Sequence, residues 1–150
     1  MKYQIKFENE VLSFQLINAT QAERRITLNL GYRTVAETFF KHLIPNEAEI
    51  DHAINFIEDE IMRHNELFEA NDTLFTSDNK VVGIFSKNGL SDLHYSRQTT
   101  EDLFSSYARV IMGAPASLLN AEITRDDVAI ILILREVMHH LGFTELTFIS

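Results

Sequence analysis

The strongest constraint on the fold is a helical repeat of apolar residues between positions 46 and 68. Asn46 and Glu49 form a capping box, in which the two side chains satisfy amides at a helix start reciprocally. Behind this box, apolar residues recur at steps of four and three, which places them in one narrow seam along a helix. The sequence therefore predicts a long amphipathic helix that packs through this seam. The seam residues are Ile50, Ile54, Ile57, Ile61, His64 and Phe68.

The same segment carries most of the negative charge of the chain. The formal net charge is −9, and residues 46–79 contain one basic and ten acidic side chains. A field of this sign repels phosphate backbones, so a nucleic-acid ligand is not expected, whereas a basic protein surface would be attracted. A solvated surface that only keeps the protein soluble is the alternative interpretation. The acidic residues predicted to bind a partner, on the side away from the seam, are Glu58, Asp59, Glu66 and Glu69.

Strands are predicted on both sides of this helix. The first three segments alternate apolar and polar residues, which indicates an antiparallel meander with one buried face. Asn88-Gly89 is the strongest hairpin signal in the chain and would join two later strands. The predicted strands are residues 3–7, 12–16, 26–30, 73–76, 81–86, 90–96 and 146–149.

Three further helices are predicted from capping pairs and from glycines at their ends. The last of these helices contains residues 128–134, which are all apolar, so it needs neighbours on every side or a second chain. A homodimer is therefore expected, since twofold dimers are the commonest oligomers. The capping pairs are Thr34 with Glu37, Thr99 with Asp102, and Thr124 with Asp127.

These elements predict an α+β fold, with residues 1–150 forming a single domain. The expected order is βββ-αα-βββ-αα-β, with about four helices packed on a mainly antiparallel sheet. The chain has no cysteine, which excludes disulfides, thiolate metal sites and a thiol nucleophile. We expect no export signal at the N-terminus and no membrane span, and hence a cytoplasmic protein.

Two constellations suggest chemistry, although the chain lacks glycine-rich phosphate loops, HExxH, GxSxG and EF-hand patterns. Asp92 and His94 lie two apart on a predicted strand, so both side chains would point to one face. A carboxylate bonded to an imidazole can prepare it as a general base, which would make the protein a small-molecule enzyme. The alternative is that both residues belong to the polar face of an exposed strand.

The second constellation is a group of glutamates and histidines on two predicted helices. Glu136 precedes His139 and His140 near the end of the last helix, and Glu60 and His64 lie four apart on the central helix. If these helices pack together, the pairs would make a carboxylate–imidazole metal site. Histidines at a helix C-terminus are also favoured by the helix dipole alone, and His64 fits the seam.

The lack of a catalytic motif and the segregated charge favour a non-enzymatic binding or adaptor protein that meets a basic protein partner through its acidic helix. No cofactor and no bound metal are required by this interpretation. The enzyme with Asp92 and His94, and the metal-binding protein with Glu and His ligands, remain as alternatives.

Overall fold

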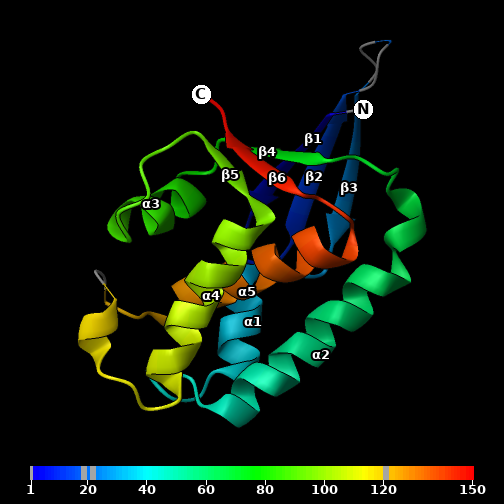
Figure 1. Cartoon of the computed structure of the whole chain (residues 1–150). Coiled ribbons are helices and arrows are strands. Elements are labelled where there is room, and N and C mark those ends of the chain that lie inside the picture. The colour runs from blue at the N-terminus through cyan, green and yellow to red at the C-terminus, as the bar shows by residue number, and fades with distance from the viewer. Residues whose placement is uncertain (1, 18–19, 21–22, 120–121) are drawn as a thin grey trace.

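The computed structural model describes residues 2–17, 20, 23–119 and 122–150. Within these residues it contains six strands and five α-helices, which form one α+β domain. Figure 1 shows a sheet at one end of the molecule with most of the helices gathered beneath it. The strands are β1 (Lys2–Phe7), β2 (Leu12–Ile17), β3 (Glu23–Leu28), β4 (Thr73–Thr76), β5 (His94–Ser96) and β6 (Glu145–Phe148). The helices are α1 (Tyr32–Phe39), α2 (Glu47–Arg63), α3 (Asn79–Lys87), α4 (Arg97–Ile111) and α5 (Arg125–His140), with short 3₁₀ turns at η1 (Asn65–Leu67) and η2 (Ala116–Leu118).

The sheet is mixed, with strand order β3-β2-β1-β4-β6-β5. The meander of β1, β2 and β3 is antiparallel, as predicted. However, β4 pairs parallel with both β1 and β6. Beyond β6, the edge strand β5 pairs antiparallel again. The expectation of a mainly antiparallel sheet is therefore wrong. The central strands pair across long stretches of sequence, and local alternation carries no information about such partners.

One face of the sheet forms the core, and alternation within the strands sets which one. Tyr3, Ile5 and Phe7 of β1 are almost fully buried, and Leu74 lies beside Tyr3 on the neighbouring strand. The intervening residues of β1 and β2 are mostly polar and lie on the opposite face, which the helices leave open. Polar side chains of β1, β2 and β3 meet on this open face and line a pocket there.

Helix α5 lies at the centre of the helical layer, in contact with α1, α2 and α4. Residues 128–134 are all buried within the single chain. The predicted caps are present, because the Thr124 side chain accepts a hydrogen bond from the Asp127 amide and Gly142 has a φ of 77° after the last turn. This apolar stretch is thus buried all round by its own neighbours, and no second chain is needed to cover it. None of the helices in the described ranges is long and apolar enough to cross a membrane.

Helix α2 follows the predicted seam and begins with the predicted capping box of Asn46 and Glu49. Ile50, Ile57 and Ile61 are buried, whereas Ile54 is half-buried. The helix ends at Arg63, five residues before the seam does. Phe68 still belongs to the core, because its ring stacks on Tyr3 and meets the edge of Phe14.

The predicted strand at 81–86 and its hairpin are wrong, since this segment forms α3. The Asp78 side chain caps the helix start by accepting from the Lys80 amide, and Val81 and Phe85 place an apolar stripe at helical spacing. Asn88 and Gly89 end the helix, with Gly89 at a φ of 80°. An Asn-Gly pair suits a helix C-terminus as well as a hairpin, because both need a residue with positive φ. Replacing the predicted strand at 81–86 with a helix converts the predicted order into the observed βββ-αα-β-α-β-αα-β.

Candidate functional site

A pocket of about 530 Å³ opens at the carboxyl ends of the adjacent parallel strands β1 and β4. Crevices outside the carboxyl ends of parallel strands are the usual ligand sites of open sheets that contain them. The pocket spreads from there over the open face of β1, β2 and β3 to the start of α3. Its lining residues are Gln4, Ile5, Lys6, Glu8, Ser13, Gln15, Arg25, Ser77, Asp78, Asn79 and Lys80.

Buried hydrogen bonds fix the two strand ends at the base of this pocket. The Asp78 carboxylate accepts from the Phe7 amide at 2.7 Å through Oδ2 and from the Lys80 amide at 2.9 Å through Oδ1. The Thr76 hydroxyl donates to the Ile5 carbonyl at 2.9 Å and accepts from the Asp78 amide at 3.1 Å. Asp78 therefore joins the end of β1 to the start of α3, and its carboxylate is occupied by backbone donors.

Glu8, Ser13 and Arg25 form a hydrogen-bonded triangle on the open face. The Ser13 hydroxyl donates to Glu8 Oε2, and Arg25 donates both to that oxygen at 3.1 Å and to the Ser13 hydroxyl at 2.8 Å. The pairing of the strands explains the meeting of these groups: Ser13 lies opposite Lys6 on β1, and Arg25 lies opposite Gln15 on β2. All these side chains consequently lie on one face of the sheet.

The electrostatics of this triangle keep Glu8 ionised at neutral pH. The hydrogen bond from Ser13 lowers the pKa of Glu8 below its ordinary value of 4.5; burial opposes this shift, and the positive charges of Arg25 and Lys6 add to it. An ionised carboxylate that is one-third exposed can orient water or accept a proton from it.

The turn that carries Glu8 is held in place by the start of α1. The Tyr32 amide donates to the Glu8 carbonyl at 3.2 Å, and the Thr34 amide donates to the Asn9 carbonyl at 3.1 Å. A Cβ atom on Gly31 would lie 2.2 Å from the Asn9 carbonyl oxygen, so only glycine permits this approach. Helix α1 accordingly begins at Tyr32, and the predicted capping box at Thr34 does not form its start.

The pocket carries a different charge from the rest of the molecule. Its lining includes three cationic side chains, Lys6, Arg25 and Lys80, against the two carboxylates of Glu8 and Asp78. The whole chain has a net charge of −9. A locally positive pocket favours an anionic ligand.

The predicted acid–base pair does not form. Asp92 lies before β5 and its amide donates to the Tyr95 hydroxyl at 2.6 Å, while the exposed His94 ring contacts the Thr147 hydroxyl at 3.1 Å. Neither hydrogen bond joins the two residues. Strand β5 begins only at His94, so the shared face that alternation predicted for the pair is absent.

The four acidic residues predicted to bind a partner do not share one face of a helix. Asp59 is exposed on α2, but Glu58 is half-buried and faces α5. Glu66 lies in η1 and Glu69 lies beyond it, because α2 ends at Arg63.

The predicted metal constellation is rearranged by the helix packing. Glu136 and His140 do meet, with His140 Nε2 3.0 Å from Glu136 Oε2, and their partner on α2 is Glu58. His139 is exposed. Glu60 is buried elsewhere and accepts from the Asn29 amide at 2.8 Å, with His64 beside it. The predicted pair of Glu136 and His140 on α5 therefore does meet, but the α2 residue beside it is Glu58, on a different face of the helix from Glu60.

Sequence reasoning missed the strand-end pocket entirely. Gln4, Lys6, Gln15 and Arg25 have the appearance of an ordinary solvent face when each strand is considered alone. One signal was present: Ser13 is a small polar residue flanked by Leu12 and Phe14 in an apolar strand. Its significance depends on Glu8 and Arg25, which only the strand register brings to it.

No protein-family model and no curated protein matches the sequence. Solved structures do match: a type II Ppx/GppA phosphatase of Aquifex aeolicus superimposes with a TM-score of 0.76 at 14% identity, over 97% of this chain and 52% of that chain. A second Ppx/GppA structure from that organism gives 0.73 at 16% identity, over 97% and 51%. An exopolyphosphatase from Cytophaga hutchinsonii gives 0.70 at 12% identity, over 100% and 53%.

These likenesses establish the fold, and the chain spans about half the length of each of these structures. They also contradict the prediction of a non-enzymatic adaptor, because almost the whole chain has the fold of part of a phosphatase. That prediction relied on the lack of a recognisable catalytic motif. At this level of identity a fold can persist after every short motif has changed.

Proposed function

We propose that this chain is a domain of a phosphatase and binds the phosphoryl group of its substrate in the strand-end pocket. The observation that carries the proposal is the locally positive pocket at the carboxyl ends of β1 and β4, in a fold shared with phosphatases. The substrate class is a phosphate ester or phosphoanhydride.

The lining residues supply the two elements that phosphoryl transfer requires, which are positioning and electrostatic stabilisation. Arg25 presents a planar guanidinium that suits phosphate oxygens, and Lys6 and Lys80 add positive charge. These cations would neutralise the charge on the transferred group and the leaving oxygen. Arg25 keeps its hydrogen bonds to Glu8 and Ser13, which hold it on the open face.

Glu8 is the residue that we assign to the attacking water. Its carboxylate would accept a proton from water while the water oxygen forms a bond to phosphorus. The leaving oxygen would depart with the electron pair of the broken bond and take up a proton from solvent. The products are orthophosphate and the leaving alcohol or shortened phosphate. Asp78 has a positioning role, because backbone amides already occupy its carboxylate.

Hydrolysis and binding assays test this assignment. The purified protein with Mg²⁺ should release orthophosphate from pyrophosphate, tripolyphosphate or p-nitrophenyl phosphate. We expect Glu8→Gln to lower kcat by roughly 100-fold, in the range found for a lost general base. Arg25→Gln should weaken pyrophosphate binding about tenfold, as expected when a charged hydrogen-bond donor is lost.

Arg33→Gln is the matched control, since Arg33 is also an exposed arginine in an ion pair but lies outside the pocket. It should leave both the rate and the binding unchanged. The proposal is wrong if the folded wild-type protein neither binds nor hydrolyses any of these compounds, or if Arg25→Gln and Arg33→Gln behave alike.

A further inference from the structure

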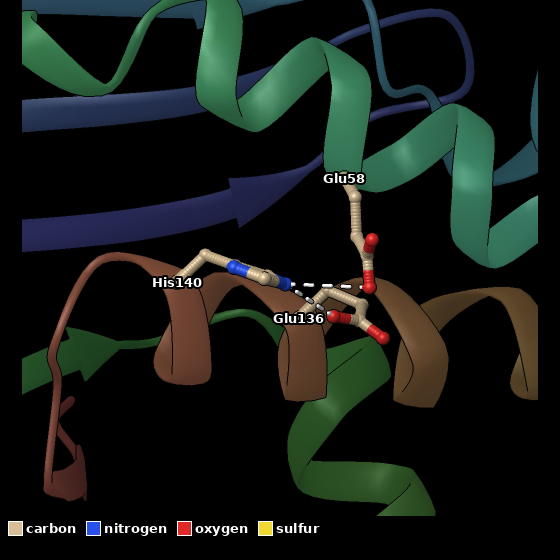
Figure 2. Close-up of side chains that lie close together, drawn as sticks. All are labelled: Glu58, Glu136 and His140. Atoms are coloured by element: carbon tan, nitrogen blue, oxygen red, sulfur yellow. Dashed lines mark ion pairs between the residues drawn. The ribbon is translucent and has the colours of Figure 1, made fainter.

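A second cluster of polar side chains lies on the other side of the molecule, between α2 and α5. Figure 2 shows Glu58 of α2 pointing toward Glu136 and His140 of α5, with the imidazole and both carboxylates converging. His140 Nε2 is 3.0 Å from Glu136 Oε2 and 3.4 Å from Glu58 Oε1. Glu136 and His140 are four residues apart, which places them on one face of the helix.

The cluster brings two carboxylates and an imidazole together in a partly buried position. The Glu136 side chain is only 3% exposed, and a second carboxylate from Glu58 lies against it. His140 Nε2 is itself buried and has no hydrogen-bond partner among the described residues despite its short distances to both carboxylates.

The distances are short enough for the three groups to share one metal ion. Bonds of about 2.1 Å place neighbouring ligand atoms roughly 3.0 Å apart at octahedral angles and about 3.4 Å apart at tetrahedral angles. The distances from His140 Nε2 to the two carboxylates match these values. The three ligand atoms all lie within 4.8 Å of one another, and the Glu58 side chain is 39% exposed.

The carboxylate of Glu136 is also held as a metal ligand would be. Arg135 donates to Glu136 Oε1 at 3.1 Å, which leaves Oε2 facing His140. Arg135 is anchored in turn by Glu101 of α4 at 2.8 Å. Partners of this kind orient ligands and are a regular part of metal sites.

We propose that Glu58, Glu136 and His140 bind a divalent transition-metal ion that joins α2 to α5. Two carboxylates and one imidazole suit Zn²⁺, Mn²⁺ or Fe²⁺, whereas the imidazole disfavours Ca²⁺ and Mg²⁺. Water completes the coordination on the exposed side of Glu58. This site is separate from the strand-end pocket and does not depend on the phosphatase proposal.

Metal titration of the chelator-treated protein at neutral pH tests the site. With Zn²⁺ and Mn²⁺ as probes, calorimetry should show one saturable site, and the melting temperature should rise with metal concentration. Glu136→Gln and Glu58→Gln should each weaken Kd at least about tenfold, since each removes a charged ligand. Glu58→Gln keeps the test valid if the buried Glu136 variant fails to fold, because Glu58 is half-exposed.

His139 provides a matched control, because it is the adjacent histidine on the same turn but is exposed. We expect His140→Gln to weaken Kd at least about tenfold and His139→Gln to change it less than twofold. Absence of saturable binding by the folded wild-type protein would overturn the proposal. Equal losses in the two histidine variants would also overturn it, because binding would then be nonspecific.

Discussion

At the scale of single residues, the ionisation of Glu8 is set by its hydrogen-bond partners. A glutamate in a turn between two strands ordinarily points into solvent and contributes little to the stability of the fold. Here Ser13 and Arg25 both donate to one of its oxygens, so the ionised form is favoured in the folded protein. The same interactions therefore contribute to stability.

The lowered pKa of Glu8 predicts a specific pH dependence of stability. A carboxyl group with a lower pKa in the folded state stabilises the protein above its unfolded pKa, and this contribution disappears as pH falls through the folded pKa. The stability difference between wild type and Glu8→Gln should be complete at pH 6 to 7 and decline below the ordinary pKa of 4.5. Urea unfolding at several pH values measures this difference.

Glu10→Gln is the control for this measurement, since Glu10 is an exposed carboxylate in the same turn. Its effect should be small at every pH, as is usual for exposed sites. A Glu8→Gln effect that stays constant from pH 7 to about pH 3 would show that the ionised carboxylate is not stabilised by Ser13 and Arg25.

At the scale of elements, helix α2 allows the clearest stability prediction. Ile57 is fully buried, and Asn55, two positions earlier, is exposed. Ile57→Asp removes an apolar contact and buries a charge without a partner, so it should cost about 4 kcal/mol or more and unfold a domain of ordinary stability.

Asn55→Asp adds the same side chain to the exposed face of α2 and should change stability by no more than about 0.5 kcal/mol. Midpoints of urea unfolding measured by circular dichroism compare the two variants. Similar midpoints for Ile57→Asp and Asn55→Asp would contradict the orientation of α2 in the structure.

The elements that the sequence predicted correctly are those whose signals are local and redundant. Helix α2 combines a capping box with a repeating apolar seam, and α5 combines the Thr124 cap, Gly142 and a length too great for a strand. Helix α3 shows the opposite case. Its Val81-Val82 pair favours a strand and Asn88-Gly89 suits a hairpin, so the outcome is decided by the Asp78 cap and by packing on α5.

At the scale of the whole molecule, the arrangement of strands could not be predicted because it depends on distant partners. Strand β4 lies between β1 and β6, which are separated from it by about 70 residues on each side. The strand-end pocket exists only because of this arrangement. Sequence alternation predicted which face of β1 is buried, but not that its other face would meet Asp78 and Lys80.

In the folded molecule, the positive charges proposed to bind a ligand lie outside the acidic segment. The sequence directed attention to the acidic segment at 46–79, whereas the candidate phosphate pocket lies where positive side chains collect locally. The homodimer stays a prediction, although its main argument is weaker now that α5 is covered by its own chain.

Titration of isotopically labelled protein with pyrophosphate, followed by amide chemical shifts, tests whether the strand-end pocket binds phosphate. We expect saturable shifts at Glu8, Ser13 and Arg25 and across 77–80, with the amides of Glu58 and His140 unchanged. Phosphate binding in this pocket is contradicted if millimolar pyrophosphate causes no saturable shift at these residues, or if the saturable shifts lie outside the pocket.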